Sequence, residues 1–359
     1  MILAALLSKR FKFLLMYLFL LLSCGTLFSG CSDGQEKITE KYELVDYYPE
    51  IFISQDYIFN NEGLNMPWHI KENPDGEIVI LDAGNVVFYV FSPEGKFLRM
   101  FSRVGQGPGE ILEPRYFDID YEGDIYVYDY GNQRLTILNK EGKYLNSFRV
   151  PHAHKRTTKM HVTKNKEILI NIPERGFFIT VFSRNGEIVR EIGEIQKEIQ
   201  EMPRFIEVAA SAHPFMDEEG NYYAFIDALL KLNVYNKEGT LIRERNLDEL
   251  LDMPIFRKNY IPPYTPGNSL FTSCSEDVIF KYDKFYLIQL TGDFRDVKTF
   301  HIYVINLDLH LMQRIALNLN EGINLQGSFR PRFDVIENGE EILFPLVKSS
   351  EILKFTKSK

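Results

Sequence analysis

The stretch "LDAGNVVFYVFSPEGKFL" (residues 81–98) returns in altered form as "YDYGNQRLTILNKEGKYL" (residues 128–145). Seven positions are identical in the two copies, each 47 residues after its counterpart: Asp, Gly and Asn in one turn, then Glu, Gly, Lys and Leu around the next. Self-similarity at a fixed period of this length indicates a repeat architecture, in which each copy is one unit that must pack on its neighbours.

Weaker copies follow along the chain. "VFSRNGEIV" places Gly186 44 residues after Gly142, and "VYNKEGTLI" places Gly239 53 residues further on. Two degraded units come last, one around "KFYLIQL" and "FHIYVINLDLHLMQRIAL", the other around "RFDVIENGEEILFPLVKSSEILKF". The sequence therefore contains six copies.

Each copy alternates short runs of β-branched and aromatic residues with Gly-, Asn- and Asp-rich turns, which predicts three or four β-strands per unit. That content and period are typical of a propeller blade. The last unit lacks an outer strand, while "YELVDYYPEIFIS" upstream of the first unit is a strand without a partner. We therefore predict an all-β fold, a six-bladed β-propeller over residues 45–359, with the N-terminal strand completing the last blade and removing the open edge.

Two motifs carry a family resemblance. "DYGNQRL" (129–135) resembles the Asp-x-x-Asn-x-Arg signature of NHL-repeat propellers, and "GQGPGE" (105–110) resembles a loop of six-bladed propeller lipoproteins from Bacteroides-type bacteria. The resemblance covers residues 40–359 in architecture, but its sharp motifs occupy only the first two units. It implies a fold and a cell-envelope location rather than an activity.

The N-terminus has the layout of a secretory signal peptide, with Lys9, Arg10 and Lys12 ahead of a long apolar run. The run is long enough to serve as an uncleaved membrane anchor instead. "LFSGC" resembles the lipobox of bacterial lipoproteins, which implies cleavage after residue 30 and acylation of Cys31. In that case residues 31–44 are a tether to the membrane, most simply the outer membrane, on either its periplasmic or its exposed side.

The charge balance limits the partners. All three charged residues of the signal are basic, so the 41 basic and 50 acidic residues of the chain become 38 and 50 in the mature form, a net charge of −12. Nucleic-acid binding requires a dense basic surface, so a nucleic-acid partner is not expected. The partners expected are the membrane, through the lipid, and a protein, a glycan or an anionic small molecule.

One face of the propeller is expected to carry the function. Strands alternate in direction from the axis outward, so the connectors between blades and the "DAGN"-type turns share a face. The connectors expected there span residues 151–158, 194–206, 248–270 and 320–331. "GQGPGE" is another such connector. Arg103 and Glu110 flank it, and we expect the two to hold it closed. Binding residues concentrate on long loops over a rigid scaffold.

Three arginines stand between a proline and an aromatic residue near the start of an innermost strand: Arg115, Arg204 and Arg332. The guanidinium group of arginine presents paired N–H donors that bind carboxylates and phosphates. We predict that Arg115, Arg204 and Arg332, with Arg103 and Glu110, form a ligand site at the mouth of the channel. The alternative is that each arginine satisfies connector carbonyls or pairs with a nearby glutamate.

Signals for catalysis are weak. His152, His154 and His161 have a spacing that suits metal ligands, but no partner carboxylate or cysteine is recognisable, and we predict no metal site, cofactor or catalytic residue. Asp82 and Asp129 resemble the acids of calcium-dependent lactonases, yet their repetition with Gly and Asn favours turn capping. The leading interpretation is a binding module rather than an enzyme; the alternative is a metal-dependent hydrolase or lyase.

Overall fold

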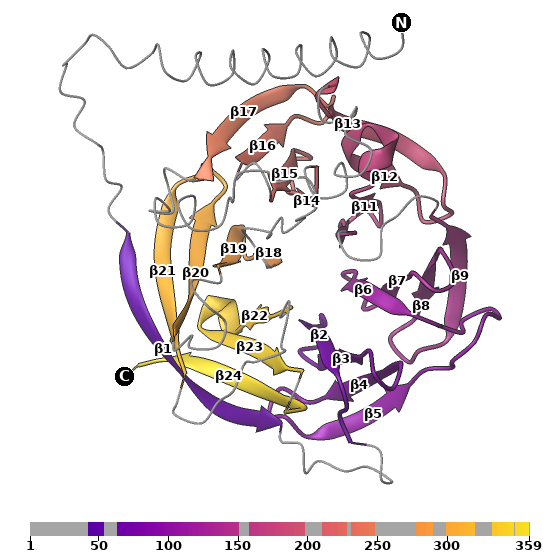
Figure 1. Cartoon of the computed structure of the whole chain (residues 1–359), viewed down its shortest axis with the longest axis vertical. Helices are drawn as coiled ribbons and strands as arrows, with labels where there is room; N and C mark the ends of the chain where they lie inside the picture. The colour runs from indigo at the N-terminus through magenta and orange to yellow at the C-terminus, as the bar shows by residue number, and fades with distance from the viewer. Residues whose placement is uncertain are drawn as a thin grey trace, which may run out of the picture. The chain divides into compact units, whose positions relative to one another are not determined.

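Six β-sheet units follow one another around a central axis in the computed structural model (Figure 1). The structure describes residues 42–53, 63–150, 158–197, 210–227, 231–247, 277–289, 299–319, 332–347 and 349–358. The first two blades consist of β2 (Pro67–Glu72), β3 (Ile78–Asp82), β4 (Val87–Phe91) and β5 (Phe97–Phe101), then β6 (Pro114–Ile119), β7 (Ile125–Asp129), β8 (Arg134–Leu138) and β9 (Tyr144–Arg149).

The next two blades repeat this order. They consist of β10 (Met160–Val162), β11 (Ile168–Ile170), β12 (Phe177–Phe182) and β13 (Ile188–Glu194), then β14 (Ala212–Met216), β15 (Tyr222–Ile226), β16 (Lys231–Tyr235) and β17 (Leu241–Asn246). Two short 3-10 turns occur among the described residues, at Pro173–Arg175 and Glu337–Gly339. In all four blades consecutive strands pair antiparallel, with the first strand nearest the axis.

The last two blades are joined into one eight-stranded sheet. The fifth contains β18 (Asp277–Lys281), β19 (Lys284–Gln289), β20 (Thr299–Asn306) and β21 (Leu311–Asn318). The sixth contains β22 (Asp334–Ile336), β23 (Glu341–Leu346) and β24 (Glu351–Lys357), and β1 (Glu43–Ile53) is its fourth strand. The predicted six-bladed β-propeller is confirmed.

Strand β1 closes the ring as predicted, because it pairs antiparallel with β24. It also pairs in parallel with β21 of the fifth blade, which the sequence did not predict. Its inward side chains Val45, Tyr47 and Ile53 are buried, whereas Leu44 and Tyr48 are exposed. The N-terminal strand therefore covers two sheet edges that would otherwise be unpaired.

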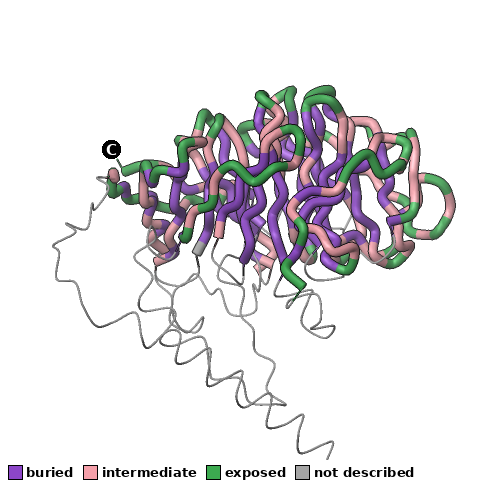
Figure 2. Tube along the Cα trace, turned by 90° about the horizontal axis from the view of Figure 1, so that it is seen from above, coloured by how far each residue is buried: buried purple, intermediate pink, exposed green. Residues whose placement is uncertain are grey.

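Burial follows position within the blade. The second strands β3 and β7 are buried at every residue, while every residue of the outer strands β5 and β9 is half-buried or exposed. In Figure 2, buried segments run through the interior of the propeller and exposed residues lie mainly at its outer turns. Neighbouring blades then pack face to face: the ring of Phe88 meets Phe117 of the next blade edge-on at 5.3 Å. Burying a side chain of this size stabilises the fold by about 1.5–3 kcal/mol.

The repeated glycines have two separate roles. Gly95 adopts a φ of 81° and donates its N–H to the carbonyl of Ser92, which closes the turn between β4 and β5. Gly142 has a φ of 79° at the matching turn, and a Cβ there would lie 2.3 Å from the ring of Phe101 in the first blade. Conformation and close approach both require glycine at that position.

No helix in the described ranges is long and apolar enough to cross a membrane. The predicted signal peptide, Cys31 and nearly all of the tether lie outside those ranges.

Candidate functional site

The "GQGPGE" connector and the "DYGN" turn meet on one face, as predicted. The side-chain amide of Asn132 donates to the carbonyl of Gly105 at 2.9 Å. Arg134 donates to three carbonyls of the connector, those of Gln106, Gly107 and Glu110, at 3.0, 2.7 and 2.6 Å. The arginine of the NHL-like motif therefore holds the loop in place.

The latch predicted between Arg103 and Glu110 is replaced by this arrangement. The carboxylate of Glu110 turns back into the loop and accepts the N–H of Gly107 at 2.8 Å. Arg103 is exposed, and its backbone carbonyl accepts the N–H of Ile111. Arg134 was missed although it belongs to the recognised motif.

Asp82 and Asp129 cap turns, as their repetition indicated. Asp82 Oδ1 accepts the N–H groups of Gly84 and Asn85, each at 2.9 Å, and its Oδ2 accepts that of Asn65 at 2.6 Å. Asp129 accepts the N–H of Glu113 at 2.8 Å and, within its own turn, the side-chain amide N–H of Asn132 at 2.6 Å. Each carboxylate thereby joins its own turn to the connector that leads into its blade.

The functional candidate lies at the axis, where first strands of neighbouring blades contact one another. We call it the axial cluster: buried or half-buried ionisable residues of the first strands and their starts, with Asp227 behind them. Its members are His69, Lys71, Tyr116, Asp118, Lys159, His161, His213, Asp227, Asp277, Arg332 and Asp334.

Part of the axial cluster is fully paired. Lys71 Nζ lies 2.7 Å from Asp118 Oδ1, and His161 Nδ1 lies 3.4 Å from Asp118 Oδ2. Asp334 accepts the N–H of Glu72 at 2.6 Å and lies 3.3 Å from Lys281 Nζ. These contacts join the first blade to the second, the second to the third, and the sixth to the first and fifth. This part of the cluster ties blades together.

Arg332 belongs to the unpaired part. Its residue is 4% exposed, and its guanidinium lies 4.4 Å from the ring centroid of Tyr116. Its backbone forms a parallel bridge with His69. Its Nε and Nη1 are buried without a hydrogen-bond partner in the structure as described. An arginine stays charged at any ordinary pH, so these donors remain unsatisfied.

Asp277 and His213 complete the unpaired part. Both carboxylate oxygens of Asp277 are buried without a partner within the described segments, and the residue is 1% exposed. His213 Nδ1 lies 3.9 Å from Asp277 Oδ1, beyond hydrogen-bonding distance. His213 Nε2 lies 3.3 Å from Asp227 Oδ1 without hydrogen-bonding geometry.

The charges of this cluster act on its two buried imidazoles. Burial, and then the charge of Arg332, lowers the pKa of His69 well below its usual value. Burial and the charge of Lys159 lower the pKa of His213. Both imidazoles are therefore largely neutral near pH 7, each with one donor and one acceptor nitrogen.

The pKa of Tyr116 is shifted by a negative charge instead. Burial, and then the negative charge of Asp277, raises the pKa of Tyr116, so its hydroxyl stays protonated. Asp277 belongs to the fifth blade and Tyr116 to the second, so charges act across the axis. Among the described residues, the axial cluster thus holds a guanidinium with two unpartnered N–H groups, a carboxylate without a donor, and neutral donors.

The predicted arginines are placed differently from one another. Arg115 pairs with Glu113, two residues earlier, which agrees with the local alternative. No described contact joins Arg115 to Arg332. Of these two arginines, Arg332 is the member of the axial cluster. Arg204 lies outside the described residues.

The three histidines considered as metal ligands also differ in their placement. His152 and His154 lie outside the described ranges, and His161 pairs with Asp118. In the described part of the chain, no three His, Cys, Asp or Glu side chains come together as a metal site would need. The predicted alternative of a metal-dependent hydrolase or lyase stays a prediction, which metal analysis of the purified protein tests.

Sequence reasoning missed most of the axial cluster. The available signal was a charged or imidazole side chain within a short apolar first strand, as in "HIK", "YFDI", "AHPF" and "DVIF". Such residues are rarely buried without a structural or functional reason.

Solved structures similar to this chain share its fold. A protein of Bacteroides fragilis described as exported is 12% identical, with a TM-score of 0.56, covering 88% of this chain and 100% of that one. An auxiliary nutrient binding protein of Bacteroides ovatus is 12% identical, with a TM-score of 0.51, covering 88% and 78%. A streptogramin B lyase is 13% identical, with a TM-score of 0.51, covering 87% and 98%. At these identities the likeness concerns the fold alone.

No curated protein matches the sequence. A family model described as a 6-bladed beta-propeller matches residues 68–253, more than half of the chain. The match spans the two sharp repeats and the two blades after them. With the ring of blades seen in the structure, it shows that the chain belongs to this six-bladed β-propeller family, DUF5128.

Proposed function

We propose that this protein is a lipid-anchored binding module of the cell envelope, whose axial cluster takes a small anionic ligand. Similar folds in an exported Bacteroides protein and in a nutrient-binding protein support the location and the class. The ligand is inferred from the axial cluster of this chain.

The observation that carries the proposal is the buried guanidinium of Arg332, whose Nε and Nη1 have no hydrogen-bond partner among the residues that the structure describes. An uncompensated buried charge is costly, and proteins keep such groups where a ligand compensates them. Carboxylates and phosphates match the guanidinium fork in charge and geometry. An anion placed here would satisfy Arg332 and lie within the field of Lys159.

Asp277 restricts the ligand further. An anion alone would be repelled by this carboxylate, whose oxygens have no described donor. A ligand that also carries a hydroxyl or ammonium group would donate to Asp277 while its anionic group faces Arg332. Amino acids, hydroxy acids and sugar phosphates have this combination.

Screening by thermal shift tests the proposal. Anionic metabolites with and without a neighbouring donor are added to the mature protein and to its Arg332→Gln variant. We expect stabilisation of the parent by one group of donor-bearing anions and none in the variant. Arg103→Gln, an exposed arginine on the same face, is the matched control and should keep the shift. Equal shifts in all three proteins would refute the axial site.

The anchor is tested separately. Cys31→Ala should abolish lipid labelling and release the protein from membranes or leave the signal uncleaved, whereas Cys24→Ala should do neither. Normal labelling of the Cys31 variant would contradict the anchor, and protease treatment of intact cells would decide which side of the membrane the propeller occupies.

A further inference from the structure

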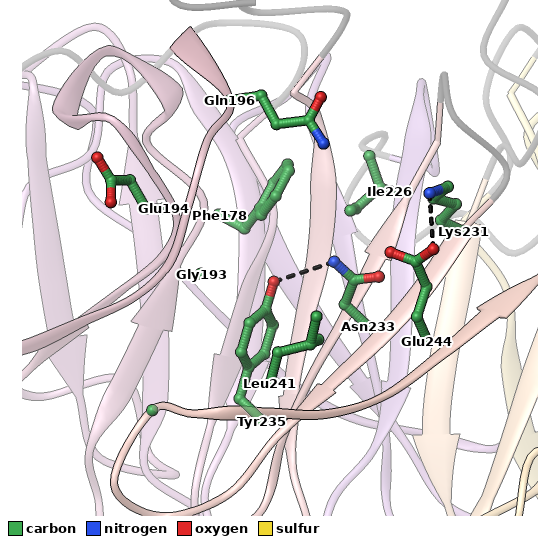
Figure 3. A pocket seen from close by; sticks show the side chains of 11 residues that line it. Phe178, Gly193, Glu194, Gln196, Ile226, Lys231, Asn233, Tyr235, Leu241 and Glu244 are labelled. Atoms are coloured by element: carbon green, nitrogen blue, oxygen red, sulfur yellow. Dashed lines mark hydrogen bonds and ion pairs between the residues drawn. The ribbon is translucent and has the colours of Figure 1, made fainter.

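A cavity of about 320 Å³ lies between the third and fourth blades, and no member of the axial cluster lines it. Strands β12 and β13 supply one wall, and β15, β16 and β17 the other (Figure 3). Side chains of both aromatic and polar character line it, chiefly Phe178, Glu194, Gln196, Asn233, Tyr235 and Glu244. Its volume suits a small molecule.

Asn233 is the unusual residue of this pocket. Its residue is 7% exposed, its Nδ2 donates to the hydroxyl oxygen of Tyr235 at 3.0 Å, and its Oδ1 has no partner in the described structure. A buried amide oxygen without a partner destabilises the ligand-free fold, so its presence requires a reason.

Gly193 makes room for the tyrosine hydroxyl. A Cβ at this position would lie 2.5 Å from Tyr235 Oη and 3.2 Å from the ring of Phe178. Gly193 also adopts a φ of 70° within the outer strand β13. The missing side chain therefore lets the hydroxyl of Tyr235 lie against the opposite blade, beside the unpaired amide (Figure 3).

The polar groups are arranged for a neutral partner. Because Asn233 donates to the Tyr235 oxygen, the tyrosine proton is free to donate, so a donor and an acceptor stand side by side. Lys231 and Glu244 neutralise each other at 2.8 Å, and Glu194 at the exposed rim disfavours an anion. Adjacent hydroxyls of a polyol both donate and accept, and its C–H faces pack on rings such as those of Phe178 and Tyr235.

We propose that this pocket between the third and fourth blades binds one saccharide residue, with Asn233 and Tyr235 as its hydrogen-bonding pair. The site is independent of the axial cluster and of the anionic ligand proposed there. The same strand position holds Thr136 in the second blade and Thr180 in the third, each fully buried with an unpaired hydroxyl. Neither lines this pocket, so they provide matched controls.

Titration of the mature protein tests this site. D-glucose, D-galactose, D-mannose and N-acetyl-D-glucosamine are titrated by calorimetry and by saturation-transfer NMR. We expect at least one to bind, Asn233→Leu and Tyr235→Phe to weaken it about tenfold or more, and Thr136→Val to leave it unchanged. Absence of binding by all four sugars at millimolar concentration, or unchanged affinity in both pocket variants, would overturn the proposal.

Two further readouts distinguish a sugar site here from a structural role of the amide and from sugar binding at the axis. Without sugar, Asn233→Leu should melt no lower than the parent, since it removes an unpaired polar group; a clearly lower melting temperature would mark the amide as structural and overturn the proposal. Arg332→Gln should bind sugar like the parent. If Arg332→Gln lost the sugar while Asn233→Leu kept it, the sugar would belong to the axial cluster, and the pocket proposal would be wrong.

Discussion

The guanidinium of Arg332 lies 4.4 Å from the ring centroid of Tyr116 at the axis. Arg332 belongs to the sixth blade and Tyr116 to the second, so the first blade lies between their two blades. The backbone of Arg332 also bridges to His69 of that intervening first blade. The axis is thus filled by ionisable side chains at this level, some paired and some not. Paired and unpaired members should respond oppositely to substitution.

Asp118 belongs to the paired members, and we expect Asp118→Asn to lower the free energy of unfolding by about 3 kcal/mol, because it leaves the half-buried Lys71 without its ion-pair partner. Urea unfolding measures this. Glu218→Gln breaks an exposed ion pair with Lys164 and should cause no measurable change. Equal, small effects in both variants would show that the axial pair does not stabilise the fold.

The same pair predicts a pH dependence. Burial alone would raise the pKa of Asp118, but the attraction of Lys71 outweighs it and holds that pKa well below its ordinary value. A depressed carboxyl pKa stabilises the folded state above the unfolded pKa, about 4, and this contribution is lost as pH falls below it. The free energy of unfolding should therefore fall more steeply below about pH 4 in the parent than in Asp118→Asn.

Closure of the ring by β1 predicts a contrast between adjacent residues. Tyr47 is 4% exposed and donates its hydroxyl to the carbonyl of Gly339, whereas Tyr48 is 50% exposed. Tyr47→Ala should lower the free energy of unfolding by about 3–5 kcal/mol, and Tyr48→Ala by less than about 0.5 kcal/mol. Deleting residues 43–53 should cause aggregation, because both β21 and β24 lose their edge partner. A stable, monomeric deletion variant would disprove this mode of closure.

Arg134 should control the rigidity of the "GQGPGE" connector. Removing its three hydrogen bonds in Arg134→Ala should speed hydrogen exchange of the Glu110 and Ile111 amides by about tenfold or more. Arg103→Ala, at the base of the same loop, should leave these rates unchanged. Unchanged exchange in Arg134→Ala would mean that the turn hydrogen bonds suffice to hold the loop.

The sequence alone determined the blades, their number and the closing strand. Period-two patterns, turn glycines and the 47-residue repeat are local features, and each blade is built from neighbouring segments. Turn capping by Asp82 and Asp129 was predictable for the same reason, since part of each cap lies within a few residues of the carboxylate. The motif also contained Arg134, whose role needed only the adjacent connector.

Only the tertiary structure decided which side chains meet. Arg332 reaches Tyr116, and β1 reaches β21, because the closed ring brings together segments far apart in the chain. Whether a buried group such as Asp277 or Asn233 has a hydrogen-bond partner depends on all the side chains around it. Those side chains come from distant segments, so no local sequence pattern predicts the outcome. Arginines that look equivalent in sequence therefore differ in the fold: Arg115 pairs with Glu113 next to it, while Arg332 lies over Tyr116 at the axis with two N–H groups that have no partner in the described part of the chain.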